Sequence, residues 1–301
     1  MPVEWTSKQL LKERLRKLWK KVTLKNRRQA ARNRAAVAEA LSVLATFPNR
    51  IDATRHTLPG ELIVSLTSYP GRFATLHLTL QSLLDQSVRP DRILLWIADT
   101  DIDQLPPAVR DLASDRLAIR VCEDIRNFKK ILPTRTEFPD AFILICDDDS
   151  YYPPNWLKGI VAHFDPARPA IICTRAHQVT RAPDGSLEPY RAWPRNVSAD
   201  WTAGHRRDLL PTGNGGVLYP PGSLPEMTLD RDLIRKLSAT SDDVWLFFMG
   251  RQAGFPVSRV PGKKREYLEW PQSQAGALWA FHRLGTKDEH LRDAAAHFGL
   301  E

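Results

Sequence analysis

The chain has 301 residues, of which 43% are hydrophobic, enough for one large α/β domain with an appendage. No stretch approaches the ~20 consecutive apolar residues of a membrane-spanning helix, and the amino terminus lacks the apolar centre of a signal peptide, so we expect a cytoplasmic protein. The three cysteines lie far apart in apolar segments, which predicts reduced core thiols and excludes a disulfide framework.

Positive charge is concentrated at the amino terminus. The formal net charge is +8, but residues 1–34 hold twelve Lys or Arg against Glu4 and Glu13, a local charge of +10. The rest of the chain therefore carries −2. This distribution argues against a nucleic-acid partner for the body of the protein.

The amino-terminal extension, residues 1–50, is predicted to be helical. Thr6 and Gln9 form a capping-box pattern, and apolar residues then recur at helical spacing with cations between them. Such a basic amphipathic helix is typical of peripheral contact with an anionic membrane, here the inner face of the cell membrane, where each cation contributes ~1 kcal/mol. A solvated helix packed on the body and an oligomerisation helix are the alternatives. A second, alanine-rich helix is expected over residues 31–45.

Residues 61–150 alternate short apolar runs with helical patterns, which predicts βαβ units and a mostly parallel sheet flanked by helices. The expected strands are 62–66, 93–98, 119–122 and 142–146, and a helix with one apolar stripe is expected to begin at Phe73.

The second half has a less regular pattern, rich in Pro, Gly, Trp and Arg. Strands are expected at 170–174 and 217–219, and helices at 230–237 and 241–249. Thr286 with Glu289 predicts the cap of a closing helix that ends at Gly299.

The most informative stretch is the end of the run 142–146, where Asp147, Asp148 and Asp149 follow directly. Adjacent carboxylates repel one another, and burying one without a partner costs several kcal/mol, so a cation is the natural compensation. Ligands bind at the carboxyl ends of parallel strands, and oxygen ligands favour Mg²⁺ or Mn²⁺. The alternative is an N-cap cluster for a helix near Pro153, although one aspartate would suffice for a cap.

Four segments occur in an order that resembles a known family: 63–72, a strand and turn; 146–149, an Asp-x-Asp-like motif; 215–219, a glycine-containing strand; and 242–245, an acidic pair. Together they resemble nucleotide-sugar-dependent glycosyltransferases of the GT-A fold, in the style of family 2 and of bacterial surface-polysaccharide transferases. The set spans about two thirds of the chain.

The resemblance implies a Rossmann-like GT-A domain over residues 51–301. Its nucleotide-binding half would be 60–150, its acceptor-binding half 151–285 and its closing helix 286–299. The implied reaction is metal-dependent transfer of a sugar from a UDP-linked donor to a glycan or lipid-linked acceptor in cell-envelope polysaccharide synthesis.

Site residues follow from the same resemblance. Asp149 is expected to bridge the metal, Mn²⁺ or Mg²⁺, and the diphosphate, with Asp147 as the second ligand. Alternatively, Asp147 or Asp148 contacts the ribose. The remaining nucleotide-binding candidates are Thr67, Tyr69, Arg72, Asp99 and, for the diphosphate, Lys130. Alternatively, Thr67 and Asp99 cap turns, Arg72 pairs with a surface acid, and one of Lys129 and Lys130 lies on a solvated helix face.

Asp243 is implied to be the general base that takes the proton of the acceptor hydroxyl, with inversion at the anomeric carbon. Asp242 would hold the loop or cap the helix, and both acids could be ordinary cap residues. His282 is either a third metal ligand or a structural histidine.

Two other functions stay open. A nucleotidyltransferase acting on sugar phosphates would use a similar sheet and similar acidic ligands, but it would want a glycine-rich basic loop where this chain has only Gly71 and Arg72. A catalytically silent glycan-binding scaffold subunit would keep the fold without turnover.

Overall fold

A computed structural model describes residues 27–50, 52–198, 204–262, 267–271, 273 and 285–300. The chain divides into two compact units, Met1–Thr46 and Phe47–Glu301. In the first unit, residues 27–44 form one helix, which includes most of the helix predicted over 31–45. The predicted capping box at Thr6 and Gln9 lies outside the described residues. Among the helices that are described, none is both long and apolar enough to cross a membrane.

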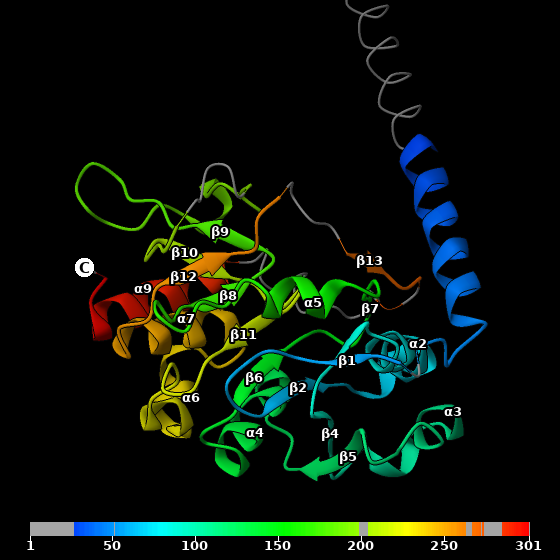
Figure 1. Cartoon of the computed structure of the whole chain (residues 1–301). Coiled ribbons are helices and arrows are strands. Elements are labelled where there is room, and N and C mark those ends of the chain that lie inside the picture. Colours follow the sequence, from blue (N-terminus) through cyan, green and yellow to red (C-terminus); the bar gives the residue numbers. More distant parts are fainter. Residues whose placement is uncertain are drawn as a thin grey trace, which may run out of the picture. The chain divides into compact units, whose positions relative to one another are not determined.

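The centre of the second unit is a seven-stranded sheet in the order β12-β8-β11-β6-β2-β4-β5 (Figure 1). In that order the strands are β12 (Val257–Arg259), β8 (Ile171–Cys173), β11 (Val217–Tyr219), β6 (Phe142–Ile145), β2 (Leu62–Thr67), β4 (Arg92–Ala98) and β5 (Leu117–Cys122). β11 is antiparallel to β6 and β8, whereas the other neighbours are parallel. The predicted mostly parallel α/β sheet is therefore confirmed.

Three short ladders lie outside this sheet. β1 (Thr54–Arg55) pairs in parallel with β3 (Val88–Arg89), whereas β9 (Ala176–Gln178) pairs antiparallel with β10 (Leu209–Pro211) and β7 (Ser150–Tyr151) with β13 (Leu268–Glu269). Sequence analysis did not predict these ladders, because two or three residues are too few to show the alternation of a strand.

Helices cover both faces of the sheet because side chains of a strand alternate between faces. Val64 and Leu144 pack in one core with α2, α3 and α5, and Ile143 and Ile145 pack in another with α4, α6, α7 and α9. The first group is α2 (Phe73–Leu84), α3 (Pro107–Arg110) and α5 (Trp156–Val161); the second is α4 (Leu132–Glu137), α6 (Arg231–Leu237), α7 (Asp242–Gln252) and α9 (Thr286–Phe298).

Short 3-10 helices complete the unit: η1 (Pro70–Arg72), η2 (Ile102–Gln104), η3 (Arg126–Lys130), η4 (Tyr190–Ala192) and η6 (Glu226–Leu229). One predicted cap is wrong. The N-cap of α9 is Gly285, with a φ of 96°, and Thr286 is the first residue of the helix. Glycine adopts this left-handed conformation without the steric penalty that a side chain would meet.

The topology determines where a site can form. Parallel strands β2, β6 and β8 end at the same edge of the sheet, and antiparallel β11 begins there. The segments that follow β2 and β6 and the segment that precedes β11 therefore meet at this edge.

Candidate functional site

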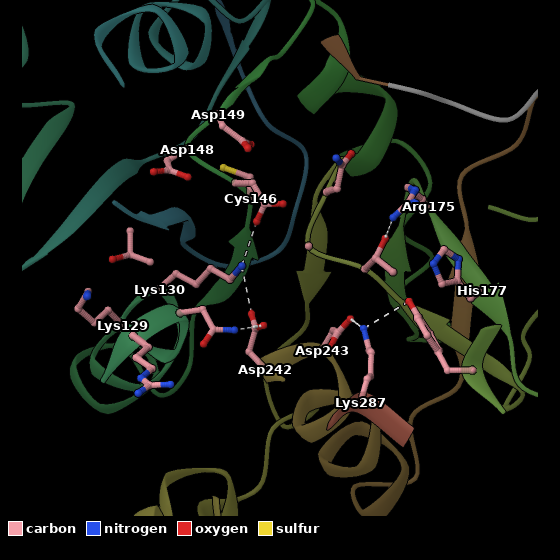
Figure 2. Close-up of a pocket in the computed structure, with 18 of the residues that line it drawn as sticks. Lys129, Lys130, Cys146, Asp148, Asp149, Arg175, His177, Asp242, Asp243 and Lys287 are labelled. Carbon is pink, nitrogen blue, oxygen red and sulfur yellow. Dashed lines mark hydrogen bonds and ion pairs between the residues drawn. The ribbon is translucent and has the colours of Figure 1, made fainter. Parts of the chain in front are cut away.

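A cavity of about 1670 Å³ opens at this edge of the sheet (Figure 2). Its walls include segments that follow β2, β5, β6 and β8, together with the first turns of α7 and α9. Ligand pockets usually measure ~300–1,000 Å³, so this cavity has room for two substrates side by side.

The three consecutive aspartates lie in this cavity, between β6 and β7. Asp148 and Asp149 are buried, with 3% and 5% exposure. Their backbone is held by Tyr152, whose hydroxyl donates to the carbonyl of Asp147 at 3.0 Å, and by the N–H of Trp270, which donates to the carbonyl of Asp149 at 2.8 Å. They do not cap the next helix, because α5 begins at Trp156.

Arg72 neutralises two of the aspartates. Its Nη1 lies 2.5 Å from Asp148 Oδ1 and its Nη2 lies 3.1 Å from Asp149 Oδ2. Burial alone would lower the pKa of Arg72, but these two carboxylates outweigh it and raise the pKa. Arg72 ends η1, directly after the strand β2, and its guanidinium stacks on the Tyr69 ring at 5.6 Å. The residue predicted beside the nucleotide therefore also holds the acidic cluster.

Lys130 joins the aspartates to the opposite side of the cavity. Its Nζ lies 3.1 Å from Asp147 Oδ1 and 3.1 Å from Asp242 Oδ2. Burial would lower the pKa of Lys130, but the two carboxylates raise it well above its usual value. The preceding Lys129 pairs with Asp124 at 2.6 Å and also lines the cavity. Both lysines thus pair with carboxylates.

The acidic pair at the start of α7 is divided between two partners (Figure 2). Asp242 accepts from Lys130 and, through Oδ1, from the side-chain amide of Asn127. Asp243 forms a close ion pair with Lys287, which is buried at the start of α9. Burial would lower the pKa of Lys287, but Asp243 raises it.

The aspartates fit a hard divalent metal that is shared with substrate phosphates. Burial, reinforced by Asp147, raises the pKa of Asp149 to about 7. Asp148 Oδ2 is buried and accepts no hydrogen bond from any described residue. Within the described ranges no three acidic, histidine or cysteine side chains already form a metal centre. Mg²⁺ is commonly held by one or two carboxylates plus phosphates, which this arrangement can provide.

Of the other predicted site residues, only some line the cavity. Thr67 and Tyr69 line the cavity, and the Thr67 hydroxyl donates to the carbonyl of Trp96 at 2.7 Å. Asp99 is exposed, accepts from the N–H of Thr100 at 2.9 Å and is not among the described residues that line the cavity. His282 lies outside the described residues.

Sequence analysis missed a group of residues on the other side of the cavity. These residues are Arg175, His177 and Lys287. His177 lies in the three-residue strand β9, and Lys287 lies in a helix that was interpreted only as a closing element. Neither belongs to a motif. The helix prediction was the one available signal, since it placed Lys287 in a first helical turn.

Comparison with known proteins gives matches at the level of structure. No protein-family model matches the sequence, and a search of the curated proteins gives no match. The chain is similar to the inositol-1-phosphate CTP transferase from T. maritima, with 13% identity, a TM-score of 0.42 and coverage of 77% of this chain and 97% of that one. It is also similar to the 4-diphosphocytidyl-2C-methyl-D-erythritol synthase from Anaerococcus prevotii DSM 20548, with 13% identity, a TM-score of 0.43 and coverage of 77% and 96%.

These findings correct the predicted family. One of these structures is described as a CTP transferase and the other as a synthase, and neither of the two is described as a glycosyltransferase. The predicted glycosyltransferase activity, its UDP-sugar donor and its role in polysaccharide synthesis are therefore contradicted. The resemblance depended on the order of four short segments, and it took Asp243 as a base for a hydroxyl, whereas the structure pairs Asp243 with Lys287. At this identity the likeness concerns the fold.

Proposed function

We propose that the chain is a metal-dependent nucleotidyltransferase that joins a nucleotide to a phosphorylated, sugar-like substrate. The observation that supports this proposal is that both acids at the start of α7 are already occupied by ion pairs and hydrogen bonds. Asp243 is ion-paired with Lys287, and both oxygens of Asp242 accept hydrogen bonds, from Asn127 and from Lys130. A hydroxyl acceptor needs a general base, whereas a phosphate is ionised at neutral pH and attacks without one.

The cavity also suits two phosphorylated substrates. Asp147, Asp148 and Asp149 line one side, where a divalent metal and a nucleoside triphosphate would bind. Arginines line the other side, where they can receive a second phosphate. These arginines are Arg175, Arg191, Arg195 and Arg292.

The reaction would be an in-line displacement at phosphorus. An oxygen of the substrate phosphate attacks the α-phosphorus of the triphosphate, the bond from that phosphorus to the bridging oxygen breaks, and pyrophosphate leaves with the electron pair. A metal held by Asp149 with Asp147 or Asp148 would neutralise charge on the triphosphate. Arg72 and Lys130 hold these carboxylates in place through ion pairs. Catalysis then depends on positioning and on electrostatic stabilisation.

The test is a matrix assay with purified full-length protein and Mg²⁺. Each of the four ribonucleoside triphosphates is combined with a panel of sugar 1-phosphates, and pyrophosphate release is measured. We expect release that requires both a triphosphate and a sugar phosphate. Release of a nucleoside diphosphate from nucleotide sugars, with no pyrophosphate from any pair of substrates, would overturn the proposal.

A further inference from the structure

His177 is a buried histidine that faces the cavity from β9. It is 2% exposed, and its strand pairs antiparallel with β10, so that His177 lies opposite Leu210. Figure 2 shows His177 beside Arg175, on the side of the cavity away from Asp148 and Asp149. It is thus well separated from the predicted metal ligands.

The protein determines which nitrogen of this ring carries the proton. The backbone N–H of Asn196 donates to His177 Nδ1 at 3.0 Å, so Nδ1 is the acceptor and Nε2 holds the hydrogen of the neutral ring. Asn196 has a φ of 45°, a left-handed conformation that asparagine tolerates better than most residues. Burial, together with the neighbouring Arg175 and Lys287, lowers the pKa of His177 to about 3, so the ring is neutral at physiological pH.

The result is a donor without an acceptor. In the part of the chain that the structure describes, no group accepts a hydrogen bond from His177 Nε2. Arg175, two residues earlier, is half-buried and directs Nη1 to the hydroxyl of Thr212 at 2.8 Å. No described carboxylate forms an ion pair with Arg175.

The surroundings of this pair add positive charge. Lys287 Nζ lies 4.5 Å from the centre of the Tyr190 ring, and the Arg195 guanidinium lies 5.4 Å from the same ring. The His177 and Tyr190 ring centres are 5.6 Å apart. The acids that act electrostatically on this pair already have partners: Asp243 is paired with Lys287, and Glu269 accepts from the side-chain amide of Asn214 at 3.3 Å. A ligand group here must accept several hydrogen bonds and carry negative charge.

We propose that Arg175 and His177 form the subsite that binds the phosphate of the second substrate. This assignment rests on the proposed function, since it places the attacking phosphate of a nucleotidyl transfer. The Arg175 guanidinium neutralises the phosphate and His177 Nε2–H orients one of its oxygens. A fixed neutral donor selects a phosphate oxygen in the same way at every pH near neutrality.

The test uses three variants of the full chain: Arg175→Gln, His177→Leu and the control His163→Leu. The control residue is a half-buried histidine that bonds Ser258 at 2.9 Å and does not line the cavity. Loss of one hydrogen bond to a charged group weakens binding by about tenfold or more. We therefore expect the KM for the sugar phosphate to rise about tenfold or more in both subsite variants. The KM for the triphosphate should stay within about twofold, as should both constants in the control.

A second measurement does not depend on turnover. Inorganic phosphate is titrated without metal, and its binding is followed by the shift in thermal unfolding. Wild type and His163→Leu should be stabilised, whereas Arg175→Gln and His177→Leu should not. If pyrophosphate is released but both subsite variants keep the wild-type KM, the subsite is wrong and the proposed function stands. If nucleotide sugars release a nucleoside diphosphate and no pair of substrates releases pyrophosphate, but phosphate binding is lost in both variants, the anion subsite stands and the proposed function falls.

Discussion

The ammonium of Lys130 lies 3.1 Å from the carboxylate of Asp242, and this contact joins the turn after β5 to the start of α7. Because Lys130 also contacts Asp147, one buried cation holds the two acidic segments of the cavity together. Buried ion pairs of this kind are costly to break, since the remaining partner keeps its charge without compensation.

Replacing Lys130 tests this relationship. Lys130→Met leaves the buried Asp242 and the half-buried Asp147 without their shared counterion and should lower the free energy of unfolding by about 3–5 kcal/mol, measured by urea denaturation at pH 7. The matched control is Lys129→Met, which leaves Asp124 with 52% of its side chain exposed and solvated. The control should lose clearly less stability. Equal losses of unfolding free energy in the two variants would show that the contact with Asp242 contributes no more stability than the control ion pair.

Asp243 tests whether the reaction needs a base. If the nucleophile is an ionised phosphate, Asp243→Asn should keep its kcat within about tenfold of wild type, because general-base catalysis typically contributes 10²–10⁴-fold. The substitution should nevertheless lower stability, because it leaves Lys287 buried without its counterion. Adding Lys287→Met in a double variant should recover part of that loss. A hundredfold or greater loss of kcat in a folded Asp243→Asn protein would identify Asp243 as a base.

Asp149 predicts a pH dependence of stability. Its pKa is about 7 in the folded protein, because of burial and Asp147, and near 3.8 in the unfolded chain. The folded state therefore binds the extra proton between these values, so this group lowers stability as pH rises from about 4 to about 7. For metal-free protein, the difference in unfolding free energy between wild type and Asp149→Asn should change by about 2 kcal/mol between pH 5 and pH 8, to the disadvantage of wild type. A difference that is constant with pH would contradict the raised pKa.

Asp149 should also be required for metal-dependent nucleotide binding. Asp149→Asn should lose the part of triphosphate affinity that depends on Mg²⁺, because the amide carries no charge for the metal. The control is Asp165→Asn, a surface acid that pairs with Arg168 and does not line the cavity. Calorimetric titration with and without Mg²⁺ measures both. Unchanged Mg²⁺ dependence in Asp149→Asn would remove the assignment of this ligand.

The glycine turn before β11 should tolerate no side chain. Gly216 has a φ of 98°, and a Cβ added there would lie 2.6 Å from the Trp156 ring, so Gly216→Ala should cost more than the about 1–2 kcal/mol of the left-handed conformation alone. Gly222 is the control, with a φ of 79° and no atom within 4 Å of its added Cβ. In thermal unfolding, the melting temperature of Gly216→Ala should be well below that of Gly222→Ala. Equal melting temperatures would mean that Trp156 can move aside.

Much of the sheet was predictable because its strands are continuous apolar runs. β2, β4, β5, β6, β8 and β11 were each expected within about two residues of their bounds, since burial on both faces produces a signal that needs no partner. The short ladders were missed for the opposite reason. β9 has only three residues and exists because β10 lies beside it, and β10 belongs to a distant segment.

The candidate site divides in the same way. Asp147, Asp148 and Asp149 were identifiable from the sequence. Three carboxylates directly after a buried strand repel one another and need a positive partner in any fold. Their partners were not. Arg72 was predicted to face a nucleotide and was found against Asp148 and Asp149.

By itself, therefore, the sequence determined the parallel sheet, the edge at which ligands would gather and the acidic strand end. The tertiary structure alone decided that Asp243 meets Lys287 and that Asn196 fixes the tautomer of His177. The physical reason is the separation along the chain over which each interaction acts. Strand formation and carboxylate repulsion act between neighbours in the chain, whereas the pairing of charges and hydrogen bonds in a cavity depends on contacts between segments that only the fold brings together.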